Sequence, residues 1–357
     1  MNISNRLQKL RQKLAENESE AIFISQPENR YYLSGFDGST GYLLITVKDA
    51  VLATDFRYVE QAGKQALEYQ IFPITGDMVN WLTELLAGLN LRKLGFEAGH
   101  LPFTIHRQLS GTLKKLSSPP DFVPVDGLVE SLRAVKEPEE IELITRASEI
   151  SDNAFKHLEK VIHTGLSEAE IAWELEKFMR ENGSQTMPFD IIVASGPNCA
   201  LPHTNPSSRI IQSGEPILLD IGAQVEGYAS DLSRTFCLGT PDGTFKKVYD
   251  IVLGAQLTAL DIIEKNITGG QADNLARKVI AESGYGEAFR HGLGHGVGLA
   301  VHESPRLGPG SDDLLVPGMT FTVEPGIYLP GWGGVRIEDL VVMENEKARI
   351  ISKAKKV

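Results

Sequence analysis

The sequence predicts an α+β protein of two domains, in which a small α/β domain precedes a larger domain built from a repeated unit. Its 357 residues exceed the size at which a single hydrophobic core stops growing, about 250 to 300 residues. Strand-like and helix-like segments alternate in the first third, and helix pairs alternate with hairpins after it. The proline-rich stretch SSPPDFVPV, residues 117–125, separates these two patterns and predicts domains at residues 1–122 and 123–357.

The first domain is predicted to begin with an amphipathic helix, because Ile3, Leu7, Leu10 and Leu14 recur at helical spacing. This segment lacks the continuous apolar core of a signal peptide. Short apolar runs and helical patterns then alternate as expected for a small α/β domain. They predict strands at residues 21–26, 41–47, 50–56 and 94–99, and helices at residues 57–68 and 103–116.

The second domain is predicted to contain two helix pairs, each followed by an apolar hairpin. Pro138 is tolerated in the first turn of a helix, and apolar residues then recur on one face as far as Ile162. Ser167 and Glu170 form a capping-box pattern that begins the next helix. The remaining elements are expected at residues 215–238 and 319–343 for the hairpins and at residues 245–264 and 271–282 for the second helix pair.

Matched acidic residues indicate that this domain is a pseudo-two-fold repeat. Gly214 precedes Asp220 by six residues in GEPILLD, and Gly318 precedes Glu324 by six residues in GMTFTVE. Both carboxylates end an apolar strand. We therefore expect the two hairpins to carry acids at equivalent positions.

Four acidic side chains are expected to face one another in two pairs. The first hairpin places Asp220 and Asp231 roughly opposite each other, and Glu324 and Glu338 are symmetric about Gly331 in the second. Directly paired residues have Cβ atoms about 4.5 to 5.5 Å apart. Ionised carboxylates that close in apolar surroundings repel each other and are costly to bury. The alternative is four separately solvated acids, but their matched positions favour a compensating positive charge.

Divalent cations would supply that charge. Carboxylate oxygens together with one imidazole suit Mn²⁺, Co²⁺, Fe²⁺ or Zn²⁺, and bridging acids would hold two ions about 3.5 to 4 Å apart. The segment RHGLGHGVGLAVHES, residues 290–304, offers three histidines among four glycines, which let the backbone approach a ligand closely. Arg336 shares a strand face with Glu338, but one arginine does not balance four acids.

These motifs resemble those of the prolidase and aminopeptidase P family, the pita-bread metallopeptidases. The resemblance rests on LLDIGA, SDLSRTF, HGLGHGVGL, TVEPGIY and GGVRIED in the second domain and, more weakly, on NRYYLSGF and TDFRYVEQA in the first. It implies a pita-bread, creatinase/aminopeptidase-like catalytic domain after a creatinase/prolidase N-terminal-like domain. It also implies a homodimer and metal-dependent hydrolysis of peptides with proline at the second position.

The resemblance implies five ligands for two divalent metal ions. Residues matching Asp231 and Glu338 bridge the ions together with a water or hydroxide, and the residue matching Asp220 binds one ion. Those matching His295 and Glu324 bind the other ion. Mn²⁺ or Co²⁺ is expected, with Zn²⁺ or Fe²⁺ as alternatives. Glu324 is also the implied general base, and a role as ligand only is the alternative.

Four further polar residues are expected beside the ions. His203, in the family's PH motif, is implied to bind substrate, and His302 is implied to stabilise the tetrahedral intermediate. His291 is expected to line the pocket, because the glycines disfavour a helix that would align it with His295. Arg336 is expected to organise the Glu338 side.

The expected substrate contacts favour a dipeptidase. The resemblance points to Phe189 and Val301 as walls of a slot for the proline ring, with ordinary core packing as the alternative. Arg306 lies just beyond His302, and a matching arginine in prolidases binds the C-terminal carboxylate of the dipeptide, which a planar guanidinium pairs bidentately. We therefore predict an Xaa-Pro dipeptidase, with an Xaa-Pro aminopeptidase acting on longer peptides as the alternative. If Arg306 is instead an ordinary solvated loop arginine, it does not distinguish these two activities.

Other classes of protein fit less well. A non-catalytic pita-bread binding module would have lost metal ligands, and creatinase-like amidinohydrolases work without the metal pair, whereas this chain retains all five ligand types. The formal net charge of −12 argues against nucleic-acid binding. Two cysteines indicate no disulfide framework, and no apolar run approaches the roughly 20 residues of a membrane span. A cytoplasmic protein is predicted.

Overall fold

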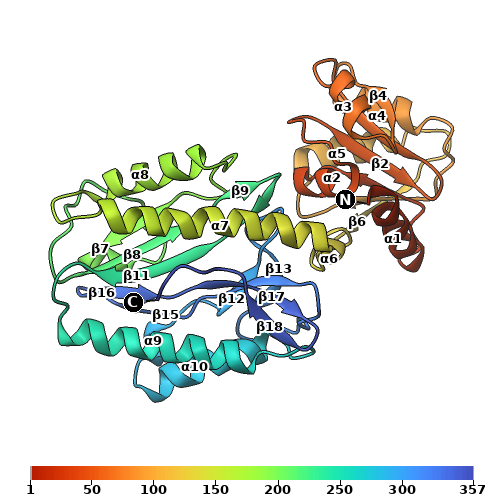
Figure 1. Ribbon diagram of the computed structural model, residues 1–357. Coiled ribbons are helices and arrows are strands. Elements are labelled where there is room, and N and C mark those ends of the chain that lie inside the picture. Colours follow the sequence, from red (N-terminus) through yellow and green to blue (C-terminus); the bar gives the residue numbers. More distant parts are fainter. Residues whose placement is uncertain (1, 357) are drawn as a thin grey trace. The chain divides into compact units, whose positions relative to one another are not determined.

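A computed structural model describes residues 2–356, which divide into two compact units, one ending at Arg133 and one beginning at Ala134 (Figure 1). This boundary lies later than the predicted one at residues 122/123. The prediction of a linker at residues 117–125 is wrong, because β6 (Asp121–Val125) pairs in parallel with β5 (Lys93–Glu97). Pro124 is tolerated there because β6 is an edge strand, where a missing N–H leaves no bond unmade.

The first unit contains a mixed six-stranded sheet in the order β4-β3-β2-β1-β5-β6. The predicted strands and helices are confirmed, whereas α2, β4, α4, β6 and α6 were not predicted. Phe23 and Trp81 pack in its core with ring centroids 6.3 Å apart. The remaining bounds are α1 (Ile3–Glu16), β1 (Ala21–Ile24), α2 (Pro27–Ser34), β2 (Tyr42–Thr46), β3 (Ala50–Thr54), α3 (Val59–Gln65), β4 (Gln70–Pro73), α4 (Met78–Leu86), α5 (Phe103–Leu113) and α6 (Glu130–Arg133).

The second unit has the predicted order of helix pair, hairpin, helix pair and hairpin. Its first half comprises α7 (Pro138–Val161), α8 (Glu168–Glu181), β7 (Ile192–Ser195), η1 (Gly196–Ala200), β8 (Pro216–Ile221), β9 (Gln224–Val225), β10 (Tyr228–Ala229) and β11 (Leu232–Cys237). Its second half comprises α9 (Gly243–Ile262), α10 (Gly269–Glu282), η2 (Gly286–Ala288), β12 (Gly294–Gly296), β13 (Glu303–Leu307), β14 (Thr320–Val323), β15 (Gly326–Leu329), β16 (Gly333–Arg336), β17 (Asp339–Glu344) and β18 (Lys347–Ile350).

The two halves repeat one another in detail. Ser167 and Thr268 each cap the second helix of their pair through a full capping box. Gly214 and Gly318, which precede the acid-bearing strands, have φ angles of 89° and 90°, a conformation that favours glycine. The predicted pseudo-two-fold repeat is therefore confirmed.

Each helix pair covers its own part of the sheet structure. The α7–α8 pair packs on the sheet β11-β8-β7, and the α9–α10 pair packs on β14 to β17 of the second half. In Figure 1 the two pairs lie on either side of the strands of this unit. The hairpins that carry the acids are thus held between two separate apolar cores, with the acids where the strands meet.

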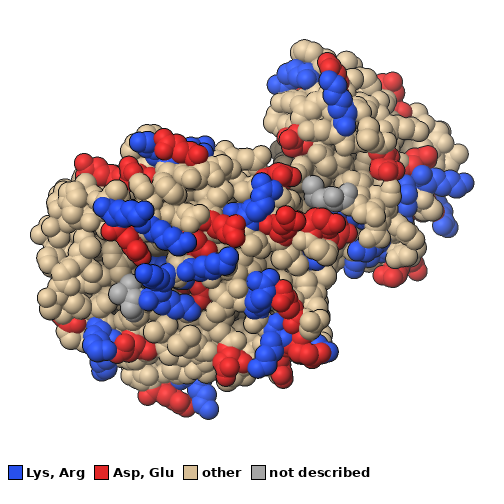
Figure 2. Space-filling model, viewed as in Figure 1, with Lys and Arg blue, Asp and Glu red and all other residues tan. Residues whose placement is uncertain are grey.

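The visible face of each unit carries mixed charge. Figure 2 shows lysine, arginine, aspartate and glutamate side chains intermixed on that face, without the basic stripe typical of nucleic-acid binding. Among residues 2–356, none of the helices is both long enough and apolar enough to cross a membrane.

Candidate metal centre and active site

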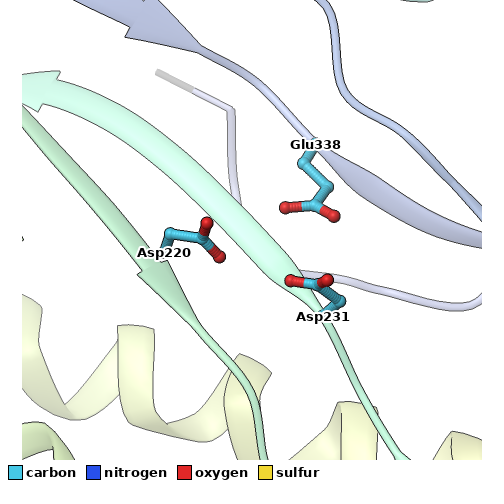
Figure 3. Close-up of side chains that lie close together, drawn as sticks. All are labelled: Asp220, Asp231 and Glu338. Carbon is cyan, nitrogen blue, oxygen red and sulfur yellow. The ribbon is translucent and has the colours of Figure 1, made fainter. Parts of the chain in front are cut away.

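Three carboxylates meet where the hairpins of the two halves come together. Asp220 lies on β8, Asp231 directly precedes β11, and Glu338 directly precedes β17. They offer oxygen atoms within 4.8 Å of one another, and Figure 3 shows the three groups turned toward a common centre. Asp231 and Glu338 are only 6% and 1% exposed, so little bulk water screens their repulsion.

The register of the first hairpin differs from the prediction. Asp220 pairs with Ser233 rather than with Asp231, which lies at the diagonal position on the same strand face. The turn residues Glu226 and Gly227, with φ angles of 48° and 82°, centre the hairpin one residue later than the prediction required. The two carboxylates still approach because diagonal neighbours share a face.

The register of the second hairpin is as predicted. Val323 pairs with Asp339, so the next positions of the two strands place Glu324 opposite Glu338. The tip β15–β16 continues the same register, which is symmetric about Gly331. Both acids thus stand at the point where the main hairpin passes into its tip.

The positive charge beside the acid cluster does not balance it. Burial and then the neighbouring carboxylates Glu338 and Asp220 hold the pKa of Asp231 well above its usual range. Burial, with Glu324 and Asp220 nearby, does the same to the pKa of Glu338. The buried Oδ1 of Asp220 and Oε1 of Glu338 have no hydrogen-bond partner among the described residues. Buried oxygen atoms without a hydrogen-bond partner can serve as ligands for divalent cations that prefer oxygen. These residues therefore fit a metal centre.

His295 and Glu324 extend the cluster. The Nε2 atom of His295 lies 3.3 Å from Oε1 of Glu324 and 3.6 Å from Oδ2 of Asp231. Although burial raises it, the pKa of Glu324 is lowered to about 2 by the hydrogen bond and charge of His295. The His295 Nδ1 atom lies 3.1 Å from the carbonyl oxygen of Gly296, which can accept its proton and leave Nε2 to face the carboxylates.

Arg336 forms its ion pair with Asp220. Its Nη2 donates to Oδ2 of Asp220 at 2.6 Å, and its Nε donates to Oγ of Ser233 at 2.8 Å. No hydrogen bond links Arg336 directly to the carboxylate of Glu338 among the described residues, but the charge of Arg336 is among the influences that lower the pKa of Glu338 against the larger effect of burial. That Arg336 organises the Glu338 side stays a prediction. The side chain points across to β8 and β11 because β16 lies beside these strands.

A second chain of contacts begins at the same arginine. Nη1 of Arg336 donates to the Tyr328 hydroxyl at 3.0 Å, and that hydroxyl lies 3.0 Å from Nε2 of His291. Because the hydroxyl oxygen already accepts from Arg336, its own proton is available to His291. Burial lowers the pKa of His291, which favours the neutral imidazole that can accept this bond.

A cavity of about 530 Å³ lies beside these groups. Predicted site residues in its wall are Phe189, His203, Asp220, Asp231, His291, His295, His302, Arg306, Glu324 and Arg336. Val301 is not among the lining residues, although its neighbour His302 is, and Glu338 reaches the site through the acid cluster. The ring centroid of His302 lies 4.2 Å from that of His295, and burial followed by the charge of His295 lowers the pKa of His302.

Three residues that contact the cluster were not predicted. Thr322 donates to Glu324 at 2.9 Å, Ser233 accepts from Arg336, and Tyr328 joins Arg336 to His291. Thr322 and Ser233 stand two residues from a predicted ligand, so strand alternation could have identified them. Asp190, which also lines the cavity, has no comparable signal in the sequence.

Comparison with known proteins assigns the chain to a family. Residues 142–345 match Metallopeptidase family M24, and residues 6–135 match the Creatinase/Prolidase N-terminal domain. The chain belongs to metallopeptidase family M24. Its architecture is a creatinase-type N-terminal domain followed by the pita-bread catalytic domain.

Several relatives of this M24 chain carry the names of Xaa-Pro peptidases. A solved structure, the Xaa-Pro dipeptidase from Bacillus anthracis, is 42% identical with a TM-score of 0.96, covering 100% of this chain and 99% of that one. The Xaa-Pro dipeptidase of Pyrococcus furiosus is 35% identical, over 99% of both chains. The structure of an X-Pro aminopeptidase from Thermotoga maritima is 36% identical with a TM-score of 0.87, covering 97% of this chain and 99% of that one.

The glycines around His295 make room for neighbouring backbone in this M24 domain. A Cβ atom on Gly294 would lie 2.1 Å from the carbonyl oxygen of Thr322, and one on Gly296 would lie 2.2 Å from that of Ser304. Strand β12 is therefore confined between β13 and β14, which restricts the backbone that carries His295.

Gly294→Ala is expected to destabilise the protein by about 1 to 3 kcal/mol, because backbone atoms of β14 would have to move. The measurement is urea unfolding followed by circular dichroism. Gly254→Ala in α9 is the control, since a Cβ atom there meets nothing within 4 Å and alanine favours a helix by about 0.5 to 1 kcal/mol. Equal stability of the two variants would contradict the packing argument.

Proposed function

We propose that this M24 peptidase hydrolyses the peptide bond that precedes proline, with Xaa-Pro dipeptides as preferred substrates. One observation carries the proposal: the buried acid cluster and the guanidinium of Arg306 belong to one cavity. No described acidic side chain pairs with that guanidinium, so it is available to a substrate carboxylate.

Five residues would hold two divalent cations, Mn²⁺ or Co²⁺ in the first place and Zn²⁺ or Fe²⁺ as alternatives. When bound, such ions polarise the scissile carbonyl and make a water molecule acidic enough to attack near neutral pH. The uncompensated oxygens of Asp220 and Glu338 support this assignment. The full proposed set is Asp220, Asp231, His295, Glu324 and Glu338.

The surrounding side chains have distinct proposed roles. The low pKa of Glu324 means that its carboxylate is ionised at neutral pH. In that form it can bind a cation, and as the proposed general base it would take the proton of a water molecule that bound cations make more acidic. His302 and His203 line the cavity and can donate hydrogen bonds to the carbonyl oxygen of the substrate. Arg336 holds Asp220 in place, and His291 is fixed by Tyr328.

The cavity also offers a surface for the proline ring. An Xaa-Pro bond has a tertiary nitrogen without an N–H, so recognition has to rely on the ring and on charge. Phe189 is half-buried, and its ring packs over Gly222, where a Cβ atom would lie 2.6 Å from Cε1 of the phenylalanine. Phe189 is the proposed apolar wall. Val301 does not line the cavity and is therefore a weaker candidate for this wall.

The second candidate function is an Xaa-Pro aminopeptidase acting on longer peptides. The similarity to the Thermotoga maritima X-Pro aminopeptidase favours it, because that likeness also extends over nearly the whole chain. A non-catalytic binding module is disfavoured by the retention of all five proposed ligands. A homodimer and a cytoplasmic location stay predictions.

Rates on Xaa-Pro, Xaa-Pro-Yaa and Xaa-Ala peptides separate these activities. Enzyme stripped with a chelator is expected to be inactive and to regain turnover with Mn²⁺ or Co²⁺, because the acids alone cannot activate water. Xaa-Pro should be cleaved fastest and Xaa-Ala least. Faster cleavage of Xaa-Pro-Yaa would favour the aminopeptidase, and full turnover by the stripped enzyme would contradict the metal mechanism.

A further inference from the structure

The residues behind the acid cluster form a second buried network that the proposed reaction does not use. Arg234 and Asp339 are 2% and 1% exposed and form an ion pair at 2.8 Å. Arg234 lies on β11, three residues after Asp231, and Asp339 follows Glu338 directly. This pair therefore links the two strand ends that carry the most buried acids of the cluster.

Arg234 also holds the backbone of the ligand strand itself. Its Nη1 atom donates to the carbonyl oxygen of Glu338 and to that of Ser233. Glu338 in turn donates its N–H to the carbonyl oxygen of Ser233 at 3.1 Å. The backbone around Glu338 is thus fixed to β11 by one side chain and one main-chain bond.

Residues 351–356, here called the clasp, close this network from the outside. The Ser352 hydroxyl donates to Oδ1 of Asp339 at 2.9 Å, and Nζ of Lys356 lies 2.5 Å from Oδ2. The carbonyl oxygen of Ala354 accepts from Nη2 of Arg234 at 2.6 Å. Asp339 lies on β17, directly after Glu338, and Arg234 lies on β11, which begins directly after Asp231. Each of these three contacts therefore connects the clasp to a strand that follows one of the acids.

The clasp is itself anchored to the other half of the repeat. Asp152 on α7 is 2% exposed, and its Oδ1 accepts the N–H groups of Lys353 and Ala354 at 2.7 Å each. The clasp therefore joins α7 and β11 of the first half to β17 of the second. Pulling Asp231 and Glu338 together opposes the repulsion between their carboxylates, which would otherwise separate the strand ends.

We infer that the clasp holds Asp231 and Glu338 at the separation that a shared divalent cation needs, so that Lys356 and Ser352 set cation affinity. They are positioning residues, because they act through Asp339 and touch neither cation nor substrate. The inference rests on the proposed cation site and not on the identity of the substrate. Partners of metal ligands typically change metal affinity about 10- to 100-fold when they are removed.

The test is a Co²⁺ titration of chelator-stripped protein, followed by visible absorption and by calorimetry. Lys356→Met and Ser352→Ala are each expected to bind Co²⁺ about tenfold more weakly than the unmodified chain. Lys356→Arg keeps the charge and should restore affinity. Lys353→Met is the matched control, because that lysine is 64% exposed and contacts Glu149 at the surface rather than Asp339.

Each outcome decides the inference. Unfolding midpoints in chelator identify a variant that fails to fold, and the milder Ser352→Ala then carries the comparison. Equal Co²⁺ affinity in the Ser352 and Lys356 variants and in the Lys353 control would overturn the clasp alone. No Co²⁺ binding by the unmodified chain would overturn the cation site and the clasp together, whereas binding without Xaa-Pro cleavage would contradict only the proposed function.

Discussion

Asp231→Asn is expected to lower kcat/KM for Xaa-Pro dipeptides at least about a thousandfold, equivalent to about 4 kcal/mol of transition-state stabilisation. Asp231 is central to the cluster, because its carboxylate is near those of Asp220 and Glu338 and lies 3.6 Å from Nε2 of His295. An amide at this position removes the negative charge while keeping the shape. Cation binding and turnover should therefore fall together, measured by metal analysis and by steady-state kinetics on the same preparation.

The same substitution is expected to stabilise the cation-free protein. Burial and neighbouring acids raise the pKa of Asp231, which means that the folded state tolerates its charge poorly. A gain of about 1 kcal/mol would raise the unfolding midpoint in chelator by about 2 to 4 °C. Asp312→Asn, at an exposed acid outside the cavity, is the control and should change neither activity nor stability. Lower stability of the Asp231 variant in chelator would show that the carboxylate has a partner other than a cation.

The second hairpin could be predicted more accurately than the first because its symmetry is visible in the chain. Gly331 marks the centre of a glycine-rich turn, so Glu324 and Glu338 can be paired by counting outward. In the first hairpin the turn falls at Glu226 and Gly227, and an error of one residue in the centre moves the partner of Asp220 by two positions. Because side chains alternate between the two faces of a strand, a shift of two positions leaves Asp231 on the same face as Asp220. The predicted acid cluster is therefore unaffected by the error in register.

Contacts between segments that are distant in the sequence could not be predicted from local sequence patterns. Arg336 was expected beside Glu338 because alternation relates residues two apart, whereas its ion pair with Asp220 depends on how β16 lies against β8. Likewise, the proline-rich segment around Pro124 has the composition of a linker, and only pairing with β5 makes it a strand. Local rules thus identified acids, histidines and turns, while the partners of charged side chains required the fold.

Arg306→Ala is expected to raise KM for Xaa-Pro dipeptides about 10- to 100-fold and to change KM for Xaa-Pro-Yaa tripeptides less than about threefold. Hydrogen bonds to charged groups contribute about 1.5 to 3 kcal/mol, which corresponds to this range. The carboxylate that follows proline exists only in the dipeptide, so a guanidinium that binds it affects one substrate class. Arg306→Lys keeps the charge but loses the bidentate geometry. Its KM for Xaa-Pro dipeptides should therefore lie between that of the unmodified chain and that of Arg306→Ala.

Arg290→Ala is the matched control for this experiment. Arg290 is also an exposed arginine near the histidine segment, but its Nε donates to the carbonyl oxygen of Glu287 and it does not line the cavity. A general loss of positive charge would affect both arginine variants alike, whereas carboxylate recognition predicts an effect of Arg306 alone. Equal rises in KM for dipeptides and tripeptides would contradict dipeptide selectivity and favour the aminopeptidase, because the guanidinium would then bind a part of the substrate that both peptides share.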